Sequence, residues 1–284
     1  CLNLPPIMAD NQPEEMSMQM SFMQHLDALR WHLVRSAIAI FIFAVTLFCF
    51  NNFLFDNVIF GPLKQEFVSY TALCELGHKI GAGDVMCMTV KEPHLQTLSA
   101  SEQFFTHMWI ALLGGIICAF PYVLYELWKF IKPALKDTES KPAKWFVIVA
   151  SILFLIGIFF GYFLLFPMSY NFLINYQLSD SGIVQTNNTL DDYISLISTM
   201  VLVSGLVFEL PVLVYFLTRL GILTPGFMRK YRKYAVVIIL IAAAIITPSP
   251  DVTSQMVVAV PMYLLYEISI FVSAYVVKKN NLEV

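Results

Sequence analysis

Apolar residues in this chain gather into six runs separated by polar segments. The runs cover residues 33–50, 104–128, 145–167, 193–220, 235–247 and 257–277. A helix needs about 20 apolar residues to cross the hydrocarbon core of a bilayer. The fifth run has only 13 residues, which suits a re-entrant segment as well as a span. The pattern predicts an all-α polytopic membrane protein with six transmembrane helices, of which the fifth and sixth are short.

The composition supports lipid as the solvent of this chain. Apolar residues make up 58% and charged residues 13%, and the mean hydropathy is +0.71. Soluble proteins are about half apolar and about a quarter charged. We expect residues 21–278 to form one membrane domain, preceded by a disordered N-terminal extension (1–20) and followed by a cytoplasmic tail (279–284).

The basic residues indicate how the chain crosses the membrane. With both termini inside and six spans, the inside segments hold 14 of the 17 basic residues, and the outside segments hold only Lys64, Lys79 and Lys91. Positive charge gathers on the cytoplasmic side of membrane proteins. Removing the fifth span would move Lys278 and Lys279 outside and weaken this bias. The charges therefore predict six spans with the N- and C-termini in the cytoplasm.

Glu209 is the sharpest feature of the apolar runs. It lies 11 residues from Leu220, or about 16 Å along a helix, which places it inside the hydrocarbon region. An ionised carboxylate there is costly, so it should face protein or water, or else be protonated and bonded to a neighbouring helix. Pro211 lacks a backbone donor and should kink this helix near Glu209. We expect Glu209 and Pro211 to be functional.

Two other carboxylates, Glu126 and Glu267, lie near the predicted inner ends of their helices. We expect both of them to reach water.

Motifs for covalent chemistry are absent from the sequence. It contains no phosphate-binding glycine loop, no H-E-x-x-H and no paired C-x-x-C, and its five histidines are not at ligand spacing. We therefore expect no enzyme activity, no metal site, no cofactor and no nucleic-acid partner.

Two segments on the predicted inner side suggest a recognition surface. Phe22–Arg35 places Phe22, Leu26, Leu29 and Leu33 at helical spacing, as in an amphipathic helix at the inner leaflet. Phe130–Glu139 contains Pro133, which should end the second helix, and two acidic residues among lysines. A solvated loop with anchoring lysines is the alternative for this second segment.

Several motifs occur together and in order. They are Phe22…His25-Leu26-Asp27-Ala28-Leu29-Arg30, Phe130…Pro133-Ala134-Leu135…Glu139, Tyr162-Phe163-Leu164-Leu165-Phe166-Pro167, Phe208-Glu209-Leu210-Pro211, Thr247-Pro248-Ser249-Pro250-Asp251…Ser254-Gln255 and Pro261-Met262-Tyr263…Tyr266-Glu267. On this topology they resemble TatC, the receptor subunit of the twin-arginine protein translocase. The resemblance covers about residues 20–278.

The resemblance implies a function that hydropathy does not reveal. It implies a bacterial inner-membrane protein that binds twin-arginine signal peptides and joins TatA-like and TatB-like single-span subunits. The complex would move folded proteins across the membrane, driven by the proton-motive force. We also expect the chain to associate with further copies of itself and to contact the lipid bilayer.

The resemblance also implies which residues recognise the signal peptide. Glu139 falls on one of the family's recognition carboxylates, and Ala28 occupies the position where the family has the other. Asp27 is adjacent, but one residue turns about 100° around a helix. Either Asp27 substitutes in a shifted pose or Glu139 contributes more. The same motifs include Phe22, Arg30, Pro133 and Leu135 as candidate binding residues, and Asp251 and Gln255 as candidate outer-face residues.

Cys74 and Cys87 lie in a loop that we expect to face an oxidising compartment. A disulfide between them would close the glycine-rich turn. This expectation rests on compartment and loop position alone.

Two other function classes remain open from the sequence. A proton-coupled secondary transporter of a small solute would use a site like Glu209 beside Pro211, although the two halves of the chain show no repeat. The other class is a purely structural membrane scaffold.

Overall fold

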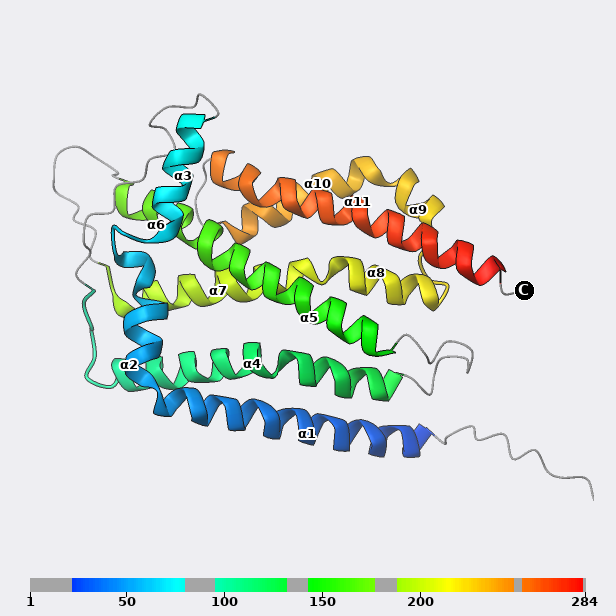
Figure 1. Cartoon of the computed structure of the whole chain (residues 1–284), viewed down its shortest axis with the longest axis horizontal. Coiled ribbons are helices and arrows are strands. Elements are labelled where there is room, and N and C mark those ends of the chain that lie inside the picture. The colour runs from blue at the N-terminus through cyan, green and yellow to red at the C-terminus, as the bar shows by residue number, and fades with distance from the viewer. Residues whose placement is uncertain (1–21, 80–94, 132–142, 177–187, 248–251, 283–284) are drawn as a thin grey trace, which may run out of the picture.

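The computed structural model describes residues 22–79, 95–131, 143–176, 188–247 and 252–282, and their regular structure is helical (Figure 1). Helices of 15 residues or more are α1 (Phe22–Cys49), α4 (Glu102–Ile131), α5 (Ala143–Phe160), α7 (Leu190–Phe208), α10 (Arg232–Ile246) and α11 (Val252–Leu282). The shorter ones are α2 (Asn51–Phe53), α3 (Val68–Lys79), α6 (Phe166–Asn175), α8 (Leu210–Arg219) and α9 (Pro225–Lys230). The described residues thus confirm an all-α protein.

Five helical stretches are long and apolar enough to cross a membrane. They are Leu29–Cys49, Glu102–Phe130, Phe146–Asn175, Leu190–Arg219 and Gln255–Lys278. They correspond to the first four predicted spans and the sixth, so the chain is a multi-pass membrane protein. The fifth predicted span falls in α10, whose 15 residues rise only about 22 Å. The total of six spans and their orientation therefore stay predictions.

The last helix corrects one expectation from the sequence. Of the two helices expected to be short, only α10 is, because α11 is 31 residues long. The apolar run at 257–277 marks only the middle of α11. The polar residues beyond each end of that run favour or tolerate helical backbone, so the helix extends past the apolar run at both ends.

The fourth predicted span is broken at Glu209. Helix α7 ends at Phe208 and α8 begins at Leu210, with the Glu209 N–H bonded three residues back to the Leu206 carbonyl. Pro211 has no N–H to donate to the preceding turn, so the regular bonding pattern cannot pass through this point. The kink predicted from the sequence is confirmed.

Small residues bring α5 and α7 together at the centre of the molecule. A Cβ added to Gly157 would lie 2.7 Å from the Ser204 carbonyl and 2.9 Å from the Cα of Gly205. The Ser204 hydroxyl also donates a 2.6 Å hydrogen bond to the Gly157 carbonyl. Close backbone approach at small residues is a common way of packing helices in membranes.

Residues 51–79, which we call the cap, fold over one end of the bundle. A π-helical turn (Leu54–Ile59) and a 3₁₀ turn (Gly61–Leu63) precede α3 in this segment. Tyr193 of α7 donates its hydroxyl to the Ile59 carbonyl at 2.6 Å, and Tyr70 within the cap donates to Pro62 at 2.8 Å. Burial raises the pKa of the Tyr70 hydroxyl, which keeps it a donor.

Helix α1 lies at the edge of the molecule and packs mainly against α4 (Figure 1). Within its apolar stretch Leu29–Cys49, Ser36 is the one buried residue. A Cβ on Gly115 of α4 would lie 2.9 Å from the Cβ of Ala44, so the middle of α4 closely approaches the C-terminal part of α1. Helix α1 is therefore held by one neighbour along most of its length.

Candidate functional site

The two predicted recognition segments start from neighbouring helix ends. The N-terminal turns of α1 carry Asp27 and Arg30, both exposed, and α4 beside it leads at Ile131 into the segment that contains Glu139. Glu139, Pro133 and Leu135 lie outside the described residues, and Phe22 is placed only as the first residue of α1. The roles of these six residues stay predictions, as does the substitution of Asp27 for a carboxylate at Ala28.

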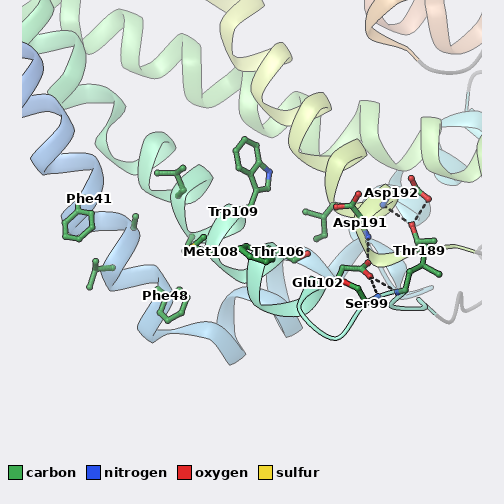
Figure 2. Close-up of a pocket in the computed structure, with 17 residues that line it drawn as sticks. Phe41, Phe48, Ser99, Glu102, Thr106, Met108, Trp109, Thr189, Asp191 and Asp192 are labelled. Carbon is green, nitrogen blue, oxygen red and sulfur yellow. Dashed lines mark hydrogen bonds between the residues drawn. The ribbon is translucent and has the colours of Figure 1, made fainter.

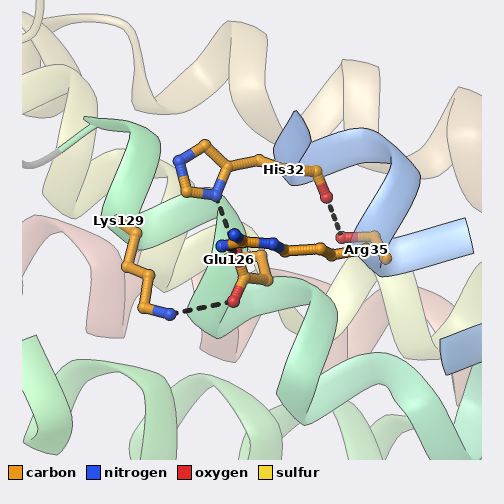
Figure 3. A network of polar contacts seen from close by, with 5 residues as sticks. His32, Arg35, Glu126 and Lys129 are labelled. Carbon is orange, nitrogen blue, oxygen red and sulfur yellow. Dashed lines mark hydrogen bonds and ion pairs between the residues drawn. The ribbon is translucent and has the colours of Figure 1, made fainter. Parts of the chain in front are cut away.

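A buried polar network joins α1 and α4 just inside these ends (Figure 3). The Glu126 carboxylate of α4 accepts a 2.6 Å hydrogen bond from Nδ1 of His32 on α1. Its other oxygen accepts from Nζ of Lys129 at 2.9 Å, and Arg35 of α1 lies 4.0 Å away. The Glu126 side chain is only 2% exposed.

The expectation that Glu126 reaches water is therefore wrong. Helix α1 packs over the carboxylate and shields it, and the cations and the imidazole N–H replace the water that it would otherwise bind. Sequence reasoning flagged Glu126 but missed His32. Helical periodicity marks which residues share a face of α1, but it does not say which of those faces meets α4.

Glu267 has a more open environment. It pairs with Arg232 of α10 at 2.7 Å and accepts a 2.9 Å hydrogen bond from the Tyr263 hydroxyl. Its side chain remains 21% exposed. This ion pair ties α10 to α11 near the end opposite the cap.

The carboxylate of Glu209 lies at the break between α7 and α8. Within the described residues neither of its oxygens has a hydrogen-bond partner, and both are buried. The alternative is a protonated carboxyl hydrogen-bonded to a neighbouring helix. Among the described residues, no group forms such a bond with Glu209. A buried polar group without a partner lowers the stability of the fold, so stability does not account for a glutamate at this position. A function at Glu209 and the adjacent Pro211 therefore stays our prediction.

The remaining predicted residues are placed only in part. Gln255 donates a 3.0 Å hydrogen bond to the Leu240 carbonyl and so links α11 to α10, whereas Asp251 lies outside the described residues. Cys74 is disulfide-bonded, but Cys87 also lies outside the described residues, so their pairing stays a prediction.

A groove of about 940 Å³ opens between α1, α4 and the start of α7 (Figure 2). Its walls are mostly apolar, with Phe41, Phe48 and Trp109 among them. At its rim the Glu102 carboxylate accepts from the backbone N–H groups of Leu98, Ser99 and Asp191 at 2.6, 3.2 and 3.1 Å. One carboxylate thereby caps the N-termini of α4 and α7 together. Among the described residues, no three His, Cys, Asp or Glu side chains gather as a metal site would need.

Comparisons with known proteins agree on one family. The family model for Sec-independent protein translocase protein (TatC) matches residues 24–261. The TatC protein of Blattabacterium sp. subsp. Periplaneta americana is 38% identical over 267 residues, covering 92% of this chain and 98% of its own length. TatCy of Bacillus subtilis is 32% identical over 263 residues, covering 92% of this chain and 91% of its own.

Solved structures agree with this result. A crystal structure of the twin-arginine translocase receptor TatC superposes with a TM-score of 0.65 at 32% identity, covering 89% of this chain and 99% of the other. With the sequence motifs in order and the fold shared, the chain belongs to the TatC family of Sec-independent protein translocase proteins.

Proposed function

We propose that this chain is the twin-arginine signal-peptide receptor and core subunit of a translocase in the bacterial inner membrane. The likeness to the solved twin-arginine translocase receptor, over nearly the whole of both chains, carries the proposal. Folded precursor proteins cross the membrane in this assembly, and the proton-motive force drives them.

The signal peptide binds at the ends of α1 and α4. Asp27 and Glu139 provide carboxylates for the two guanidiniums, which bind carboxylates in a planar, two-bonded geometry. Arg30, Phe22, Pro133 and Leu135 shape the surrounding surface. Lysine offers a single point charge, so a twin-lysine peptide does not reproduce this geometry.

The proposal is tested by photocrosslinking from positions 22–30 and 130–139 to a twin-arginine precursor. We expect crosslinks from both segments, weaker crosslinks for Glu139→Ala and weak crosslinks to a twin-lysine precursor. Equal crosslinking of the Glu139→Ala variant and the parent would refute the assigned role of Glu139. Crosslinks that do not depend on the arginines would refute the receptor function.

The other subunits of the complex are single-span proteins of the TatA and TatB kinds. Exposed apolar side chains along α1, α10 and α11 leave helical faces that lipid or such helices can cover. Copurification of tagged single-span subunits with this chain tests the assignment. A chain that transports precursors without them would contradict it.

A further inference from the structure

Helix α1 takes its rotation from its contacts with one neighbour, α4. It packs mainly against α4, and Ser36 is the one buried residue of its apolar stretch Leu29–Cys49. The close approach of Ala44 to Gly115 sets the distance between the C-terminal part of α1 and the middle of α4. The ring of Phe48, stacked on His107 at 4.0 Å between centroids, fixes α1 near its C-terminal end, so the direction in which its N-terminal turns face depends on contacts nearer to them.

The bond between His32 and Glu126 is such a contact (Figure 3). Lys129 lies on the same helix as Glu126, and Arg35 of α1 stays 4.0 Å away, so His32 supplies the close polar link between the two helices. An ionised carboxylate only accepts hydrogen bonds, so Nδ1 of His32 carries the proton. A directed hydrogen bond to a buried carboxylate fixes which face of α1 meets α4.

We infer that Glu126, acting through His32, is a positioning residue that sets the rotation of α1 and thereby the direction of Asp27 and Arg30. These two residues lie five and two positions before His32, on the exposed turns of the same helix. A slip of one residue would turn each side chain by about 100°. The inference rests on the proposed signal-peptide function, because it explains how the receptor holds one half of its binding surface.

The structure also provides a clean variant for testing the inference. Replacing His32 leaves Glu126 paired with Lys129 at 2.9 Å, so the buried carboxylate keeps a charged partner. Replacing Glu126 itself would remove the partner of three side chains. His32→Ala therefore releases α1 with little disturbance to α4.

The first experiment measures the rotation directly and needs no peptide. Genetically encoded spin labels at positions 27 and 122, both exposed, report the distance between α1 and α4 in the full chain in lipid nanodiscs. We expect one narrow distance distribution in the parent and a broader or shifted one in His32→Ala. Identical distributions would overturn the inference.

The second experiment measures binding of a synthetic twin-arginine signal peptide to the unlabelled chain. We expect His32→Ala to bind about tenfold more weakly, equivalent to about 1.4 kcal/mol. Its preference for twin-arginine over twin-lysine peptide should fall as well. His32→Asn, whose amide places an N–H donor where Nδ1 stands, should restore both, which a general loss of stability would not allow.

Lys129→Gln is the matched control, since it alters the partner of Glu126 that lies within α4. We expect its affinity for the peptide to stay within about twofold of the parent, because the Lys129–Glu126 pair lies within α4 and does not set the rotation of α1. Equal weakening by Lys129→Gln and His32→Ala, or unchanged binding in His32→Ala despite a broadened distance distribution, would overturn the positioning role. A parent chain that binds no twin-arginine peptide overturns the proposed function, and the spin labels still show whether His32 holds α1.

Discussion

At the scale of single residues, the molecule places carboxylates in three different environments. Glu102 accepts three backbone N–H groups, Glu126 is enclosed by donors from two helices, and Glu209 has no partner among the described residues. Stability alone explains the first two arrangements. It does not explain Glu209, because a buried carboxyl without partners lowers the free energy of unfolding.

Replacing Glu209 with Gln or Ala should therefore separate stability from function. We expect the thermal stability of the purified protein to stay the same or rise, while transport of a twin-arginine precursor into membrane vesicles falls at least about tenfold. Glu267→Gln, which removes the exposed pair with Arg232, serves as the control and should transport normally. Normal transport by Glu209→Ala would rule out a functional role.

Two buried tyrosines provide a test of how the cap is held. The Tyr193 hydroxyl bonds to the Ile59 carbonyl at 2.6 Å, whereas the buried Tyr170 hydroxyl has no partner within the described residues. Tyr193→Phe should lower the free energy of unfolding by about 1 kcal/mol, because it leaves a carbonyl unsatisfied. Tyr170→Phe should be neutral or stabilising. Thermal unfolding of both variants checks the difference, and an equal loss in the two would contradict it.

At the scale of helices, the features that depend on a single segment could be predicted from the sequence. The run 104–128 became α4, which extends two or three residues further at each end, and Pro211 located the break between α7 and α8. Apolar length and a missing donor act locally, so they are visible in one segment. The contact of His32 with Glu126 depends on how two helices are rotated against each other. The hydropathy of either helix leaves that rotation undetermined.

The packing of α5 against α7 gives a prediction at this scale. Gly157→Ala should lower stability by about 1–3 kcal/mol, because its Cβ would meet backbone atoms of Ser204 and Gly205 that cannot move aside cheaply. Gly226→Ala is the control, since no atom lies within 4 Å of the added Cβ. Unfolding temperatures of the two variants test the prediction, and it fails if Gly157→Ala unfolds no earlier than Gly226→Ala.

At the scale of the whole molecule, the number of crossings depends on α10. Its 15 residues are fewer than a span of ordinary bilayer needs, yet the placement of basic residues favours a crossing. We expect a reporter fused at the N-terminus and a reporter fused after Leu282 to be active on the same side of the membrane, the cytoplasmic side. If α10 is re-entrant, the C-terminal reporter faces the other side.

The attachment of α1 to α4 has a consequence for the order in which the protein is made. The contacts that hold α1 involve Ala44 with Gly115, His32 with Glu126, and the ring of Phe48 stacked on His107 at 4.0 Å between centroids. All of these residues precede position 131, and the chain emerges from the ribosome starting at its N-terminus. The first helical hairpin can therefore close, with α1 already turned to its final direction, while the C-terminal helices have yet to be synthesised.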